Sequence, residues 1–221
     1  MKRLGWLVAL SGVAMLTQFG AAPEAQQANA GAAAGQVRTY YVAAEEVEWD
    51  YAPLGIDMMT GQAFEGTSAA YTQPGPNHIG HIYRKAIYRE YTDDTFRTRK
   101  PRAAQDEYLG LLGPVLRAEV GDTIKVVFKN NASRPYTITM QEDVFRPKHP
   151  AGDGITLDAE GIANRGMPED AVQPGATVTY EWGVPTLAGP EPGSPSSVSW
   201  LYRSRMDEAK DVAAGLVGPV I

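Results

Sequence analysis

The apolar positions of this chain form short alternating stretches, the pattern of strands with one buried face. The clearest runs from Thr123 to Phe128, where Ile124, Val126 and Phe128 fall on one side. The same pattern predicts strands at residues 38–49, 82–91, 123–128, 135–140, 177–182 and 198–202, with another starting at Gly113. We therefore predict an all-β chain.

Glycine and proline separate these stretches, and 23 glycines and 16 prolines favour a β-sandwich or barrel over a helical fold. Residues 50–80 read as a Gly/Pro-rich excursion, and residues 97–108 as a polar connection. One short helical turn is expected near the C-terminus, at residues 207–214, with Gly215 as its stop. Asp207 and Glu208 would then lie at its N-terminus, where acidic groups suit the helix dipole.

The N-terminal segment has the layout of a secretory signal peptide. Lys2 and Arg3 precede an apolar run at residues 4–19, and a small-x-small sequence ends at Ala30, although residues 20–22 offer an alternative cut. We predict a signal peptide at 1–30, a disordered leader at 31–36 and a single domain at 37–221. The mature protein is expected to be secreted or periplasmic after cleavage near Ala30.

The net charge bears on the class of binding partner, and the cysteine content bears on disulfide bonding. The chain carries −6, of which the expected signal peptide supplies +1, so the mature part carries −7. An acidic surface argues against nucleic acid or an anionic membrane as the main partner. No second apolar run is long enough to cross a bilayer. There is no cysteine, which excludes disulfides.

Several sequence blocks, in order along the chain, resemble one protein family. They are YYVAAEEV at 40–47, WDYAP at 49–53, YRKAIYREYTD at 83–93, LGLLGP at 109–114, RAEVGDT at 117–123, FKNNA at 128–132, SWLYRSRMD at 199–207 and VAAGLVGPVI at 212–221. This order is similar to the first cupredoxin (plastocyanin-like) domain of ceruloplasmin- and hephaestin-type multicopper oxidases, and to the A domains of coagulation factors five and eight. The resemblance implies a cupredoxin-like Greek-key β-sandwich with long loops.

The resemblance also implies four copper-ligand positions, and none holds histidine here. In the family two His-x-His pairs of one domain face a copper cluster. Thr139 and Gln141 occupy the first pair, and Arg203 and Arg205 occupy the second. A guanidinium group stays protonated and has no lone pair to offer a metal. A blue-copper site needs a Cys thiolate, so we expect no copper cofactor in this chain.

The three histidines and an acidic loop are the remaining candidates for a metal site. His78 and His81 have a spacing that could bind a metal, but they fall in the Gly/Pro-rich excursion, and His149 is read as a surface residue. The resemblance implies a calcium site formed by Lys148, Glu169 and Asp170, while Gly166 stands where an amide ligand is expected. Carboxylate and carbonyl oxygens suit Ca²⁺. The alternative is a solvated acidic loop.

Arg203 and Arg205 admit two interpretations. Both would project from one strand face near Thr139 and Gln141, and could pair with Glu142 or Asp143 as a clamp between strands. They could instead form an anion site, or dock carboxylates of another protein.

The sequence holds no nucleophile elbow, phosphate-binding glycine loop or His-Glu-x-x-His motif, so no catalytic motif of these kinds indicates an activity. Three functions stay open. The first is a structural or partner-binding module, with another cupredoxin domain or subunit as partner. The second is a scaffold subunit of a copper-dependent oxidase, of the multicopper oxidase or ferroxidase type, that another chain completes. The third is a mononuclear metal-binding or storage protein.

Overall fold

The structure is a computed structural model that describes residues 35–141, 144–145 and 171–221. Strands dominate these residues. They are β1 Val37–Asp50, β2 Ile56–Asp57, β3 Gln62–Ala63, β4 Ile82–Tyr91, β5 Thr123–Asn130, β6 Thr139–Met140, β7 Thr177–Gly183, β8 Trp200–Arg203 and β9 Val217–Val220. The helical elements are short: α1 Gly66–Thr72, α2 Glu208–Ala214, and the 3₁₀ turns η1 Ala104–Leu109 and η2 Thr186–Ala188.

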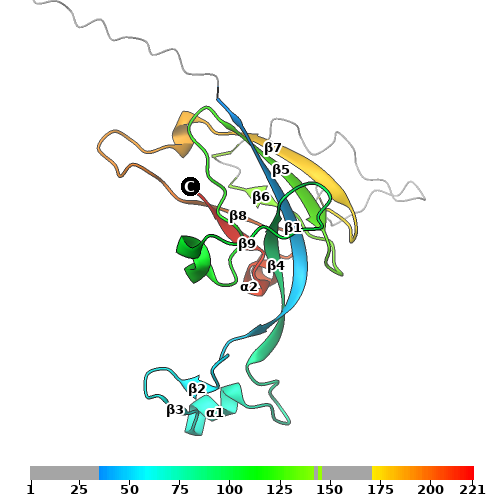
Figure 1. Ribbon diagram of the computed structural model, residues 1–221, viewed down its shortest axis with the longest axis vertical. Helices are drawn as coiled ribbons and strands as arrows, with labels where there is room; N and C mark the ends of the chain where they lie inside the picture. The colour runs from blue at the N-terminus through cyan, green and yellow to red at the C-terminus, as the bar shows by residue number, and fades with distance from the viewer. Residues whose placement is uncertain (1–34, 142–143, 146–170) are drawn as a thin grey trace, which may run out of the picture. The chain divides into compact units, whose positions relative to one another are not determined.

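The larger sheet has the order β4-β1-β5-β7, with β1 parallel to β5 and the other pairs antiparallel. Figure 1 shows β1 lying between β4 and β5. At its middle, Val42, Ala43 and Ala44 are all fully buried. A strand buried on both faces has a continuous apolar run in place of alternation, and this segment has one.

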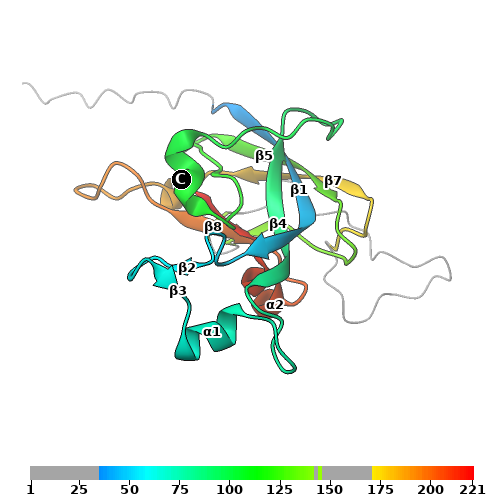
Figure 2. The same ribbon diagram turned by 60° about the horizontal axis from the view of Figure 1, so that its bottom comes forward.

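The second sheet, β6-β8-β9, is antiparallel and lies across the core from the first. Side chains of both sheets join in one hydrophobic cluster, in which Tyr88 of β4 packs against Phe128 of β5 and Tyr202 of β8, with ring centroids 5.9 and 5.4 Å apart. Figure 2 gives a second view of β1, β4 and β5 together with β8. The molecule is therefore an all-β sandwich, as predicted.

Residues 51–79 leave the sandwich between β1 and β4 as an excursion that includes β2, β3 and α1. None of their side chains is buried. Backbone bonds hold the base of the excursion, where the Tyr51 N–H donates to the His81 carbonyl at 3.0 Å. Near this base, the rings of Tyr51 and Tyr83 meet edge to face, and the ammonium of Lys85 lies 5.2 Å from the Tyr51 centroid.

The predicted C-terminal helical turn is confirmed as α2. Asp207 is its N-cap, and Gly215 follows it with φ of 120°, a backbone conformation that favours glycine. The predicted strand at 135–140 is wrong over most of its length, because only Thr139 and Met140 pair in a ladder. Residues 113–116 also form no named strand, and only Leu116 bridges to Val220. The helices α1 and η1 lie where loops were expected.

Candidate functional site

The two strands that carry the expected ligand positions lie side by side. The register of β6 and β8 places Thr139 directly opposite Arg203, and Met140 opposite Tyr202. Cross-strand partners have Cβ atoms only about 4.5–5.5 Å apart. Thr139 and Arg203 are therefore neighbours on one small sheet, as the sequence interpretation required.

The half-buried Arg203 has an acidic partner that the sequence interpretation did not choose. Its Nε lies 2.8 Å from Oε1 of Glu208, the first residue of α2. The N–H does not point at that oxygen, so the contact is an ion pair without a well-formed hydrogen bond. The partners proposed from the sequence, Glu142 and Asp143, lie outside the described residues.

Arg205 lies beyond the end of β8, so alternation along a strand does not place it on the same face as Arg203. Its side chain is exposed, and its backbone N–H donates to Oγ1 of Thr137 at 2.9 Å. The carbonyl of Gln141 accepts hydrogen bonds from the N–H groups of Val144 and Phe145. The four expected ligand positions thus share a region, but they occupy different local structures.

Ser204, between the two arginines, is fully buried and anchors α2 to the sheet. Its hydroxyl donates to Oδ2 of Asp211 at 2.5 Å and accepts from the N–H of Thr137 at 3.3 Å. The buried Asp211 carboxylate also accepts from the N–H of Asp207 at 3.2 Å. A buried carboxylate is stable when donors surround it. This network holds the strand end, the Thr137 segment and the helix together.

Two buried tyrosines extend this polar network into the core. The Tyr88 hydroxyl donates to the Thr137 carbonyl at 2.5 Å, and the Tyr202 hydroxyl donates to the Pro114 carbonyl at 2.7 Å. Burial is the main reason why the pKa of each phenol is well above its ordinary value. Burial therefore favours the protonated phenols, the form that donates these two hydrogen bonds.

Comparison with known proteins decides the family. The multicopper oxidase family model matches residues 110–221, half of the chain, including β5 to β9 and the positions just described. The chain belongs to the multicopper oxidase family. Mouse ceruloplasmin is 44% identical over 193 residues, covering 83% of this chain and 17% of that protein.

Mouse hephaestin and human ceruloplasmin agree with this multicopper oxidase assignment. Mouse hephaestin is 41% identical over 189 residues, with 83% of this chain and 15% of that protein covered, and human ceruloplasmin is 41% identical over 197 residues, with 83% and 18% covered. The chain spans about a sixth of the length of these relatives. A solved multicopper oxidase from Pseudomonas thermotolerans superposes with a TM-score of 0.45 at 19% identity, covering 85% of this chain and 29% of that one.

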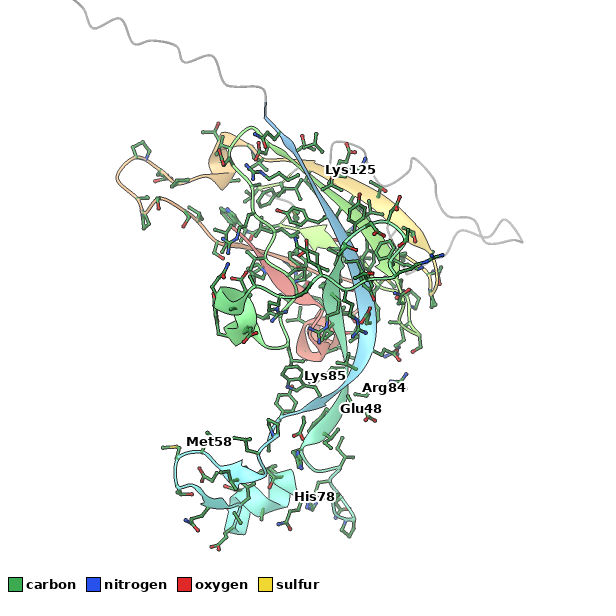
Figure 3. The ribbon with its side chains drawn as sticks, viewed as in Figure 1. Glu48, Met58, His78, Arg84, Lys85 and Lys125 are labelled. Carbon is green, nitrogen blue, oxygen red and sulfur yellow. The ribbon has the colours of Figure 1, made fainter. Side chains whose placement is uncertain are left out.

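Within this multicopper oxidase domain, the expected metal residues fall in different places. Lys148, His149, Glu169 and Asp170 lie outside the described residues. Nδ1 of His81 lies 2.5 Å from Oδ1 of Asp50, and this contact is the main cause that lowers the pKa of Asp50. His78 forms a two-residue bridge with Gly75 through backbone bonds, and Figure 3 shows it in the excursion with Met58.

Two absences apply only to the part of the chain that the structure describes. In residues 35–141, 144–145 and 171–221, no three His, Cys, Asp or Glu side chains gather as a metal-binding group. In the same residues, no helix is both long and apolar enough to cross a bilayer.

Sequence reasoning missed the roles of Glu208 and Asp211. Glu208 was assigned to the helix dipole, although its carboxylate contacts Arg203. Asp211 lies four residues after Asp207 and three after Glu208. Because acidic residues in a short helix are usually exposed to solvent, nothing in the residue types set Asp211 apart from the other two. The only available signal was the apolar stretch that follows, which indicates that one side of this helix is packed.

Proposed function

We propose that this protein is an exported cupredoxin domain that holds no copper of its own and acts as a structural or partner-binding module. The observation that carries the proposal is the pairing of Thr139 with Arg203, whose guanidinium is held by Glu208. At this place a metal would need a neutral imidazole or a carboxylate with free lone pairs. A protonated guanidinium repels a cation, and its ion pair occupies the carboxylate of Glu208.

Without bound copper, this chain would offer ferrous iron no metal that accepts its electron. Asp207 and Glu208 could attract Fe²⁺ to the surface of α2, but Asp207 is paired with Lys210 at 2.5 Å and Glu208 with Arg203. Oxidation of Fe²⁺ also needs a redox metal or another electron acceptor close by. We therefore propose binding in place of catalysis for the isolated chain.

A second candidate function is a subunit of a copper-dependent oxidase that other cupredoxin domains complete. It is favoured by the identity of about 40% to ceruloplasmin and hephaestin over only about a sixth of their length. In that case Arg203 and the exposed Arg205 would face carboxylates of the neighbouring domain, because guanidinium groups bind carboxylates through paired hydrogen bonds. Calcium binding by Lys148, Glu169 and Asp170 remains a prediction for either function.

The test is iron oxidation by the purified mature chain after incubation with Cu²⁺ and desalting. We expect Fe²⁺ to be oxidised, and oxygen consumed, at the rate of the protein-free buffer. Heat-denatured protein treated in the same way is the control for adventitious copper. Turnover that exceeds both controls and saturates with Fe²⁺ would contradict a non-catalytic module and would assign the chain an oxidase activity of its own.

A further inference from the structure

Five cationic side chains gather around one pocket, far along the chain from Arg203. The pocket has a volume of about 600 Å³, and its cationic lining residues are Arg89, Arg99, Lys100, Arg102 and Arg117. Of the described residues, two carboxylates, Glu90 and Asp106, share the lining. The chain as a whole carries −6, so this is a local reversal of charge. Such a concentration of one sign attracts anions.

The available carboxylates are already paired with three of these cations. Oε1 of Glu90 lies 2.8 Å from Nζ of Lys100, and Oδ1 of Asp106 lies 3.5 Å from Nη2 of Arg117. The buried carboxylate of Glu45 receives Arg99 at 2.6 Å and the hydroxyl of Tyr91. Among the residues that the structure describes, the other two cations, Arg89 and Arg102, therefore form no ion pair with a carboxylate.

One of the two is Arg102, which is fixed in place by the backbone. Its Nη1 donates to the Gly110 carbonyl at 3.0 Å, and its Nη2 donates to the Leu112 carbonyl at 2.5 Å. Carbonyl oxygens orient a guanidinium but do not cancel its charge. The backbone after η1 thus holds Arg102, which precedes η1, in place at the pocket.

The other is Arg89, on the edge strand β4. Its Nε is enclosed by the protein and has no hydrogen-bond partner among the described residues. Burial lowers the pKa of Arg89, and the nearby Arg102 and Arg99 lower it further. Leaving a partly enclosed charge uncompensated is costly, and a bound anion removes that cost.

We propose that this pocket binds a small multivalent oxyanion, such as phosphate or a polycarboxylate, through Arg89 and Arg102. Guanidinium groups bind carboxylate and phosphate oxygens through paired hydrogen bonds. A volume of about 600 Å³ accommodates ligands of that size with some water. The site is independent of the copper positions and of the proposed module function.

The experiment is thermal unfolding and calorimetric titration of the mature chain with sodium phosphate and with sodium citrate, at constant ionic strength set by NaCl. For a ligand present at 100 times its dissociation constant, we expect the unfolding midpoint to rise by roughly 5 °C or more. Arg89→Met should lower the affinity at least tenfold, without lowering the midpoint in ligand-free buffer. The matched control is Arg84→Met. Arg84 lies on the same strand (Figure 3), and its side chain is 72% exposed and pairs with Glu46.

The two anions distinguish the chemistry of the ligand, since a site for phosphate alone should ignore citrate. If Arg89→Met fails to fold, Arg117→Gln on the pocket rim, with its side chain 54% exposed, should weaken binding by a smaller factor. Equal midpoints in phosphate, citrate and NaCl would overturn the proposal. So would an affinity that neither Arg89→Met nor Arg117→Gln reduces.

Discussion

Replacing Tyr202 with alanine should destabilise the domain by about 3–5 kcal/mol, the usual cost of removing a buried aromatic ring. The Tyr202 side chain is fully buried, packs against Tyr88 with ring centroids 5.4 Å apart, and lies so close to Gly218 that a Cβ there would collide with its ring. The change also removes the hydrogen bond to the Pro114 carbonyl. The free energy of unfolding in urea measures the effect.

The control for Tyr202→Ala is Leu201→Ala, the neighbouring position of β8, where the side chain is 48% exposed. Because it removes little buried surface, its cost should stay below about 1 kcal/mol. Similar losses for the two variants would show that Tyr202 does not join the two sheets in the way described.

Replacing Asp211 with alanine should destabilise the domain by roughly 2–4 kcal/mol, because it leaves two buried or half-buried donors without an acceptor. These are the hydroxyl of Ser204, now 2.5 Å from the carboxylate, and the N–H of Asp207, now 3.2 Å away. The loss should detach α2 from the sheet before the rest of the sandwich unfolds. Hydrogen exchange of the amides of residues 207–216 reports this local opening.

Arg203→Met is the matched comparison for Asp211→Ala. Arg203 and Glu208 are 36% and 59% exposed, and ion pairs of this kind contribute about 0–1 kcal/mol. We therefore expect Arg203→Met to change the free energy of unfolding by less than about 1 kcal/mol. A larger loss for Arg203→Met than for Asp211→Ala would transfer the structural role to the arginine clamp.

The sequence predicted the larger sheet well because its strands carry their own signal. The alternation of Ile124, Val126 and Phe128 matches three fully buried side chains. Residues 135–138 misled the prediction for a physical reason. Ile138 is fully buried, but the β pairing described for this segment is an isolated bridge between Tyr136 and Val172, and its other bonds involve side chains. The apolar pattern of this segment therefore reflects buried side chains, not pairing with a neighbouring strand.

The missed helices α1 and η1 lack the signal that reveals a helix. Neither contains a buried residue, so neither shows an apolar stripe at helical spacing. α2 was predicted because Asp207 and Gly215 mark its two ends, as a cap and a stop.

The candidate site was predicted in part. Matching blocks on both sides of Arg203 and Arg205 led to the assignment of the ligand positions, which stays a prediction. The structure shows that Thr139 and Arg203 lie opposite each other in the pairing of β6 with β8. The partner of Arg203 could not be predicted, because it depends on where α2 packs. The pocket around Arg89 could not be predicted either. Its cations come from β4, residues 99–102 and Arg117, which only the folded chain brings together.

The most direct test of the central claim is copper content, measured by mass spectrometry on the mature chain after incubation with Cu²⁺ and Ca²⁺ and desalting. We expect no stoichiometric copper in the natural chain. The double variant Thr139→His/Arg203→His, which opposes two imidazoles across β6 and β8, should retain Cu²⁺ under the same treatment. One or more equivalents of copper in the natural chain would contradict the account of a copper-free domain.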